Sequence, residues 1–187
     1  YLLAYVATNL ELPRSWALDA ILVGAALGVV LVPIAGALSD RVGRKPVYRV
    51  GAWIGLLFAF PAAFLVQTEN RWAISLVFVV GLGVIYGTVY GPLAAFWSEL
   101  FDTRYRYTAL SSLYQISGIV ASGLTPLIAA WLVSLGSGTL WWVAAYNVAV
   151  AVLSLVSARL LPETRGRDLD HAWRAAPTSE PRETVAA

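Results

Sequence analysis

The segment GALSDRVGRKPVYR, residues 36–49, places four cations and one aspartate inside a long apolar sequence. No charged residue lies between Asp19 and Asp40 before it, and none lies from residue 50 to residue 67 after it. At a helical rise of 1.5 Å per residue the first run is about 30 Å long, which matches the hydrocarbon thickness of a bilayer. The segment therefore predicts a short charged loop between two membrane-spanning helices.

Further uncharged runs raise the expected number of complete spans to five. One covers residues 72–98, and no charged residue occurs between Arg106 and Arg159. The latter run is too long for one crossing, so the LGSGT segment at 135–139 is expected to fold it back into two helices. The opening YLLAYVATNL is predicted to end a further helix. Because the chain contains no methionine and begins inside an apolar run, it is expected to lack its natural N-terminus.

The composition indicates an integral, all-α membrane protein. Hydrophobic residues make up 59% of the chain and charged residues only 13%, against about one quarter charged in soluble domains. The chain has no cysteine and one histidine, His171, which argues against disulfides and metal clusters. The spans hold no carboxylate pair and no nucleophile with a base, so neither an enzyme nor a cofactor is expected. The small net charge of +2 is dispersed, so nucleic acid is not an expected partner.

The distribution of cations predicts the orientation in the membrane. Short loops rich in Lys and Arg stay in the cytoplasm. Only Arg14 and Arg71 fall in one set of alternate connections. The other set holds eleven cations: Arg41, Arg44, Lys45, Arg49, Arg104, Arg106, Arg159, Arg165, Arg167, Arg174 and Arg182. We therefore expect a multi-pass protein of the plasma membrane with a cytoplasmic C-terminus, in which residues 1–164 form the bundle and residues 165–187 a largely disordered tail.

Small residues and prolines predict how the spans pack. Glycines recur at a spacing of four, which lets helix backbones approach closely in lipid. The pairs or triplets are Gly24 and Gly28, Gly51 and Gly55, and Gly83, Gly87 and Gly91. Prolines lie inside expected spans and suggest kinks there; they are Pro33, Pro61, Pro92 and Pro126.

Three stretches resemble the major facilitator superfamily. Residues 36–45 are similar to its GxLxDRxGRR loop motif at Gly36, Leu38, Asp40, Arg41, Gly43, Arg44 and Lys45. YGPLAAFWSELFDTRYRYTALSSLYQ, residues 90–115, resembles the tenth and eleventh helices of its metabolite:proton symporters, the shikimate, α-ketoglutarate and proline/betaine type carriers. PETRG, residues 162–166, is similar to the PETxG after the twelfth helix. The GPxxW pattern of sugar porters is not met, because Leu93, Ala94 and Ala95 follow Gly91 and Pro92.

The resemblance implies helices eight to twelve of a twelve-helix fold, preceded by the end of helix seven. It implies a secondary active transporter that carries a small polar metabolite, an organic acid or zwitterion, with protons by alternating access. An upstream N-terminal half of the same chain and the lipid bilayer are then further partners. Two alternatives remain open: a sugar-porter-like facilitator that moves solute without protons, and a non-transporting membrane receptor or remnant of the same fold.

The resemblance also implies a conformational charge network on the cytoplasmic side. Asp40, Arg41 and Arg44 match the loop motif. Their expected partners from the other inner connections are Glu99, Arg104, Arg106, Glu163 and Arg165. An exposed ion pair contributes about 0–1 kcal/mol, so several such pairs bias two states without locking either.

Polar residues inside spans are the candidates for a substrate path, because such residues avoid lipid. Tyr86 and Tyr90 lie one turn apart near the expected midplane. A stripe at 4, 3, 4, 3 spacing runs along the next span, with Ser111, Gln115, Gly118, Ser122 and Thr125; it either lines the cavity or packs against another helix. No Lys or Arg lies within the spans to meet a substrate carboxylate. The acids lie at span ends, so the proton-binding acid is expected upstream.

Overall fold

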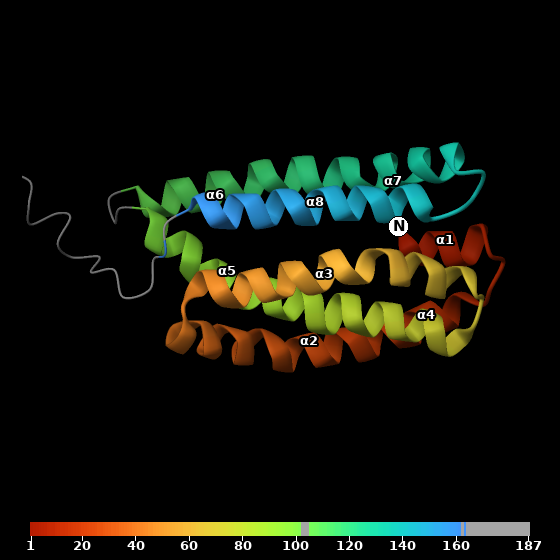
Figure 1. Cartoon of the computed structure of the whole chain (residues 1–187), viewed down its shortest axis with the longest axis horizontal. Coiled ribbons are helices and arrows are strands. Elements are labelled where there is room, and N and C mark those ends of the chain that lie inside the picture. Colours follow the sequence, from red (N-terminus) through yellow and green to blue (C-terminus); the bar gives the residue numbers. More distant parts are fainter. Residues whose placement is uncertain (102–104, 162, 164–187) are drawn as a thin grey trace, which may run out of the picture.

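The computed structural model describes residues 1–101, 105–161 and 163, in which the chain forms helices joined by short connections (Figure 1). A short helix, α1 (Leu2–Thr8), comes first. Within the described residues, five helical rods are long and apolar enough to cross a membrane. The rods are α2 (Arg14–Val42), α3 (Arg44–Gln67), the continuous rods Arg71–Leu100 and Arg106–Leu135, and α8 (Trp141–Leu160). The predicted all-α fold with five spans is confirmed.

Two rods contain a π-helical turn near their centre. The rod Arg71–Leu100 consists of α4 (Arg71–Phe78), the π-helix η1 (Val79–Ile85) and α5 (Tyr86–Leu100). The rod Arg106–Leu135 consists of α6 (Arg106–Ser117), the π-helix η2 (Gly118–Gly123) and α7 (Leu124–Leu135). The helices α2, α3 and α5 continue through their internal prolines. The departures from α-helical geometry therefore lie at glycine-containing turns, which were not predicted from the sequence.

The expected charged loop at 36–49 is almost entirely helical, which corrects that prediction. The helices α2 and α3 are separated by one residue, Gly43, whose φ of +120° is strained for any residue with a side chain. Both helices extend beyond their uncharged runs, because a helix continues into water as long as its backbone groups find partners. The charges of this segment therefore lie on rigid helix ends.

The glycine spacing predicted a close approach of helix backbones, and the structure places it between α2 and the rod Arg71–Leu100. A Cβ atom added at Gly24 would lie 2.9 Å from the backbone oxygen of Phe78. A Cβ added at Gly91 would lie 2.6 Å from the oxygen of Val32, and the neighbouring turns are equally close. Real Cβ atoms do not approach so closely, so these contacts require glycine. Gly51 has the same role between α3 and α5, where an added Cβ would lie 2.8 Å from Val89 Cγ2.

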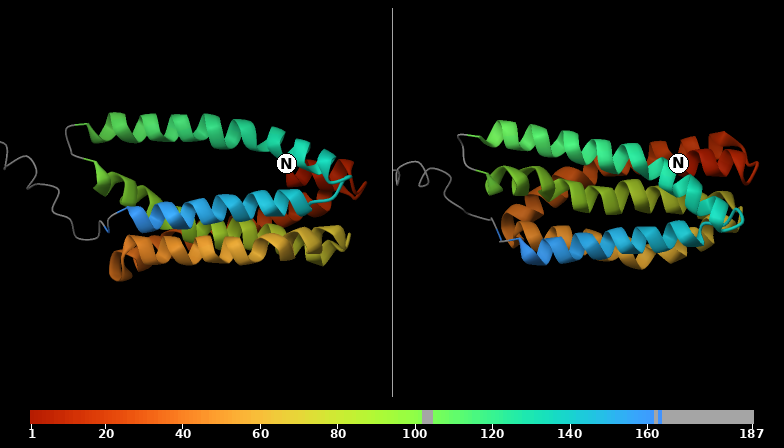
Figure 2. Two further views of the ribbon diagram at one scale, coloured as in Figure 1. Left: turned by 45° about the horizontal axis from the view of Figure 1, so that its top comes forward. Right: turned by 90° about the horizontal axis from the view of Figure 1, so that it is seen from above.

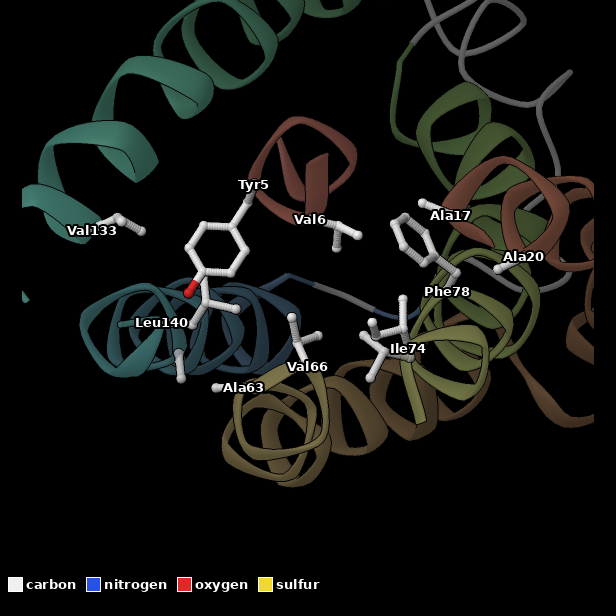
Figure 3. Packing of buried hydrophobic residues seen from close by; sticks show 12 residues of the cluster. Tyr5, Val6, Ala17, Ala20, Ala63, Val66, Ile74, Phe78, Val133 and Leu140 are labelled. Carbon is white, nitrogen blue, oxygen red and sulfur yellow. The ribbon is translucent and has the colours of Figure 1, made fainter. Parts of the chain in front are cut away.

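A hydrophobic cluster closes one end of the bundle, where α1 enters it (Figure 3). Tyr5 and Val6 of α1 are buried among residues of α2, α3, α4, α7 and α8. The hydroxyl of Tyr5 donates a hydrogen bond of 2.7 Å to the backbone oxygen of Gly138, in the turn between α7 and α8. This turn falls in the predicted LGSGT fold-back. The cluster therefore fixes α1 against the C-terminal hairpin.

The helix α6 is the least packed part of the bundle. None of its residues is buried, and outside its own rod it packs mainly against α5. Figure 2 shows α6 standing away from α8, whereas α7 and α8 converge at their connected ends. In contrast, α3 packs along α8 and α2 packs along α5. The helix α6 therefore contributes little to the packed interior of the described bundle.

Candidate functional site

Arg44 is the centre of an ion-pair network at the end of the bundle where α2 meets α3. Its Nη2 donates a hydrogen bond of 2.8 Å to Oε1 of Glu99, and its Nε lies 3.2 Å from the same oxygen. The Arg44 and Glu99 side chains are only 11% and 14% exposed. Glu99 lies at the end of α5, so this pair joins the first residue of α3 to the rod that contacts α2.

Asp40 and Ser39 complete this network from α2. Nη1 of Arg44 donates to Oδ1 of Asp40 and, at 2.8 Å, to the hydroxyl of Ser39. Ser39 is fully buried and donates in turn to the backbone oxygen of Gly36. Asp40 is 61% exposed, so water competes for its pair with Arg44. Ser39 was not predicted as a network residue, because an isolated serine at the end of a span carries no distinguishing pattern.

A second junction joins the start of α3 to the end of α8. It is formed by the side chains of Glu163 and Lys45, which bond to backbone groups at these two helix ends. The Glu163 carboxylate accepts hydrogen bonds of 2.9 and 3.1 Å from the backbone amides of Arg44 and Lys45. These amides belong to the first turn of α3, where an anion is favoured by the helix dipole. The ammonium of Lys45 donates to the backbone oxygens of Arg159 and Leu161 at the end of α8. Lys45 was predicted only as part of the loop motif.

The other predicted network residues lie outside this arrangement. Arg41 is exposed and makes no hydrogen bond or ion pair with the described part of the chain. Arg106 donates from Nε to the backbone oxygen of Phe101 at 3.3 Å, and does not meet Arg44 or its partners. Arg104 and Arg165 lie outside the described residues, as does the predicted tail at 165–187.

A separate ion pair lies at the opposite end of the bundle. Nη2 of Arg71 lies 3.2 Å from Oδ2 of Asp19, and the guanidinium carbon is 6.0 Å from the centre of the Trp16 ring. The Arg71 and Asp19 side chains are 50% and 60% exposed. This pair joins the start of α2 to the start of α4. Among the described residues, the two ends of the bundle therefore each carry ion pairs between different helices.

Tyr86 and Tyr90 lie at mid-depth on the first turns of α5. Their rings stack with centroids 4.9 Å apart and planes inclined by 13°, and both side chains are exposed. They line a groove of about 390 Å³ between α5, η1 and α2, together with Val29, Val32 and Pro33. No charged side chain lines this groove among the described residues. The predicted pair thus faces an open apolar groove.

The predicted polar stripe on the next rod is exposed. Ser111 and Gln115 lie on α6, and Ser122 lies within η2. Because a π-helical turn takes more residues than an α-helical one, η2 shifts Ser122 relative to the face that the α-helical spacing assigned to it. Tyr114, also on α6, was not selected from the sequence. Its ring meets Trp97 of α5 edge to face, with centroids 4.9 Å apart.

Two apolar cavities lie between α3, α7 and α8 and their neighbours. One of about 470 Å³ is lined by residues of α3, η1 and α8, and one of about 250 Å³ lies closer to α7. Asn147 of α8 is exposed and lines both cavities. Apart from Asn147, the polar side chains that line them are Tyr1, Tyr48, Thr125, Tyr146 and Ser154.

A bundle of five candidate spans, with ion pairs between helices at its ends and exposed phenols at mid-depth, defines a multi-pass membrane protein. Over residues 1–175 the sequence matches the family described as sugar (and other) transporter. The chain belongs to this family, within the major facilitator superfamily, and the resemblance to metabolite transporters is confirmed.

Three curated relatives illustrate the similarity. The glycine betaine/proline/ectoine/pipecolic acid transporter of Dickeya dadantii is 36% identical over 159 residues, which are 83% of this chain and 31% of the relative. The proline/betaine transporter of Escherichia coli K12 is 35% identical over 179 residues, 94% of this chain and 35% of the relative. The shikimate transporter of the same strain is 30% identical over 165 residues, which are 88% of this chain and 38% of the relative.

These relatives are transporters rather than enzymes. The chain spans about a third of the length of the curated relatives that it matches. No solved structure matches the chain significantly.

Proposed function

We propose that this chain is the C-terminal part of a secondary active transporter that moves a small polar metabolite across the plasma membrane together with protons. The upstream half of the same polypeptide would supply the other wall of the transport path. Transport would proceed by alternating access, in which two helical halves rock about a site between them.

The Arg44 network is the single observation that carries this proposal. It joins α2, α3 and α5 at one end of the bundle through polar contacts between side chains. Contacts of this kind are present in one conformation and absent in another at modest free-energy cost, which is the property that a gate between two states needs. Asp40, Arg44 and Glu99 would therefore stabilise one of the two conformations.

The cations support a cytoplasmic position for this network. Arg41, Arg44, Lys45 and Arg49 lie at the α2–α3 junction, and Arg159 lies at the end of α8 next to it. Arg14 and Arg71 lie at the opposite end. Under the positive-inside rule, the network and the C-terminus would face the cytoplasm.

The exposed residues of α5 and α6 would face the upstream half and line the substrate path. Tyr86 and Tyr90 are at mid-depth in the rod Arg71–Leu100, and Gln115 is exposed on α6. Polar side chains in such positions are costly in lipid, so a water-filled path explains their exposure. Both π-helical turns lie at this depth, and such turns are frequent at functional sites.

Uptake by the complete carrier in proteoliposomes tests the proposal. Solute accumulation that requires an inward proton gradient and collapses with a protonophore is the expected result. Equilibration that does not depend on the gradient would replace the symporter with a facilitator. Saturable solute binding without flux would instead favour a non-transporting receptor of the same fold.

A further inference from the structure

Ser39 is a polar side chain that is completely shielded from solvent where α5 packs on α2. Ala35 and Gly36, one turn earlier on α2, lie directly against Gly91 of α5. A Cβ atom added at Gly91 would lie 2.8 Å from the Cβ of Ala35, and one added at Gly36 would lie 3.4 Å from the oxygen of Gly91. Residues three and four apart share a helix face, so Ser39 also faces α5. Its burial therefore depends on the close approach of these two helices.

The hydroxyl of Ser39 acts toward Arg44 only as an acceptor. Its hydrogen is donated to the backbone oxygen of Gly36 at 2.7 Å, and a hydroxyl has no second hydrogen to donate. A lone pair of the same oxygen accepts a hydrogen bond of 2.8 Å from Nη1 of Arg44. The backbone of α2 therefore fixes the direction in which this acceptor points, and with it the position of Nη1.

Ser39 and Asp40 are unequal partners of Nη1, although both belong to α2. Asp40 is 61% exposed, so water competes for its contact with Nη1. Ser39 has no exposed surface, and a hydrogen bond to a charged group is stronger where water is excluded. Because the guanidinium is planar and its donors form a rigid fork, a fixed Nη1 also directs Nε and Nη2 toward Glu99.

We propose that Ser39 is the positioning residue of the ion-pair network: its hydroxyl holds the guanidinium of Arg44 in the orientation that meets Glu99. The inference rests on the proposed function, because this network is the gate of the proposed transporter. Residue 39 is an unspecified position of the GxLxDRxGRR motif, so the resemblance assigns it no role.

The position of the hydroxyl makes the network sensitive to the separation of α2 from α5. If these helices part, water reaches Ser39 and competes for Nη1, as it already does at Asp40. The guanidinium then loses its shielded acceptor on α2, and its contact with Glu99 is no longer held in one orientation. The ion pair and the close packing of α2 on α5 therefore stabilise the same conformation.

Initial uptake rates of the complete carrier, normalised to its amount in the membrane, test the role with two substitutions. Ser39→Ala removes the acceptor and should lower the rate about tenfold. Ser39→Cys keeps a side chain of similar size, but its sulfur is a weak acceptor, so a comparable loss is expected. A loss in Ser39→Ala that Ser39→Cys does not share would show that the residue only fills space, and would overturn the proposal.

Ser98→Ala is the matched control, because Ser98 makes the same kind of local bond and meets no cation among the described residues. Its hydroxyl donates to the backbone oxygen of Ala95, three residues earlier, at 2.8 Å, as that of Ser39 does to Gly36. It lies in the last turn of α5, at the same end of the bundle. The uptake rate of this variant should stay within about twofold of the unmodified carrier. Equal losses in Ser98→Ala and Ser39→Ala would contradict a role through Arg44.

A double-mutant cycle with Arg44→Leu distinguishes positioning from a general structural role. It is read from the rate at which a membrane-impermeant maleimide labels Gln115→Cys on exposed α6, in a carrier without other reactive cysteines. Ser39→Ala and Arg44→Leu should each change this rate in the same direction, by about five- to tenfold. Because Ser39 acts through Arg44, the double variant should match Arg44→Leu within about twofold. Multiplication of the two single effects would overturn the proposal.

The two measurements separate this inference from the proposed function, because labelling does not require uptake. Labelling rates that follow the cycle, in a carrier that takes up no solute, would remove the transport function and leave the positioning role intact. Gradient-driven uptake and labelling that are both unchanged in Ser39→Ala would retain the transporter and reject the role of Ser39.

Discussion

Nη2 of Arg44 lies 2.8 Å from Oε1 of Glu99, and this contact joins the N-terminus of α3 to the end of α5. Both side chains are shielded from water, whereas Asp40, the other carboxylate partner of Arg44, is 61% exposed. The two carboxylates are therefore unequal. Losing one partner of a buried pair costs roughly 3–5 kcal/mol, and losing an exposed partner costs about 0–1 kcal/mol.

The first prediction follows from this inequality. In the complete carrier, Glu99→Gln is expected to lower the initial uptake rate about tenfold or more, because it leaves the Arg44 charge shielded and poorly compensated. Asp40→Asn should have a smaller effect. Uptake normalised to the amount of carrier in the membrane measures both. The double variant Arg44→Glu with Glu99→Arg, which exchanges the two charges, should recover part of the lost uptake rate. A loss of uptake in Asp40→Asn that equals or exceeds the loss in Glu99→Gln would contradict the prediction.

The second prediction concerns the reciprocal caps between α3 and α8. Glu163→Ala removes the acceptor for two backbone amides in the first turn of α3, which should cost about 1 kcal/mol. For a chain of this size, that loss corresponds to a fall of about 2–4 °C in Tm. Thermal unfolding of the purified protein in detergent measures it. Arg41→Ala is the control, because Arg41 is an exposed cation of the same junction without a described partner.

The third prediction concerns the close approach of α2 to α5. Gly91→Ala introduces a Cβ atom 2.6 Å from the oxygen of Val32, so the helices must separate, at a cost of about 1–3 kcal/mol. Gly118→Ala is the matched control, because an added Cβ there meets no atom within 4 Å. Chemical denaturation of both variants compares their free energies of unfolding. Equal stability of the two would show that the glycines are not required for packing.

The fourth prediction concerns the origin of proton coupling. Asp19 pairs with Arg71 at the end of the bundle, half-exposed and outside the groove near Tyr86. Asp19→Asn should therefore leave gradient-driven accumulation within about twofold of the unmodified carrier. Uptake as a function of external pH measures this. Loss of accumulation with solute exchange preserved would place a coupling acid in this half of the carrier.

The sequence by itself determined the number of spans and their packing faces. Bilayer thickness sets a minimum length for an uncharged run that spans the membrane. Such runs can be counted along the chain, for example between Asp19 and Asp40 or between Arg106 and Arg159, without knowledge of any tertiary contact. The spacing of the glycines likewise shows that they share one face of their own helix, because α-helical periodicity is a local property of the chain. The resemblance of residues 36–45 to a superfamily motif led to the prediction that Asp40 and Arg44 take part in a charge network.

Only the tertiary structure decided which side chains meet. Glu163 was expected to join the ion pairs, but its described bonds are to two backbone amides that lie 119 and 118 residues earlier. Such amides exist as partners only because α3 begins directly after Gly43. The π-helical turns and the approach of Tyr114 to α5 were also not predicted. The physical reason is that local periodicity fixes a residue's face on its own helix, whereas partners depend on how separate helices are placed against one another.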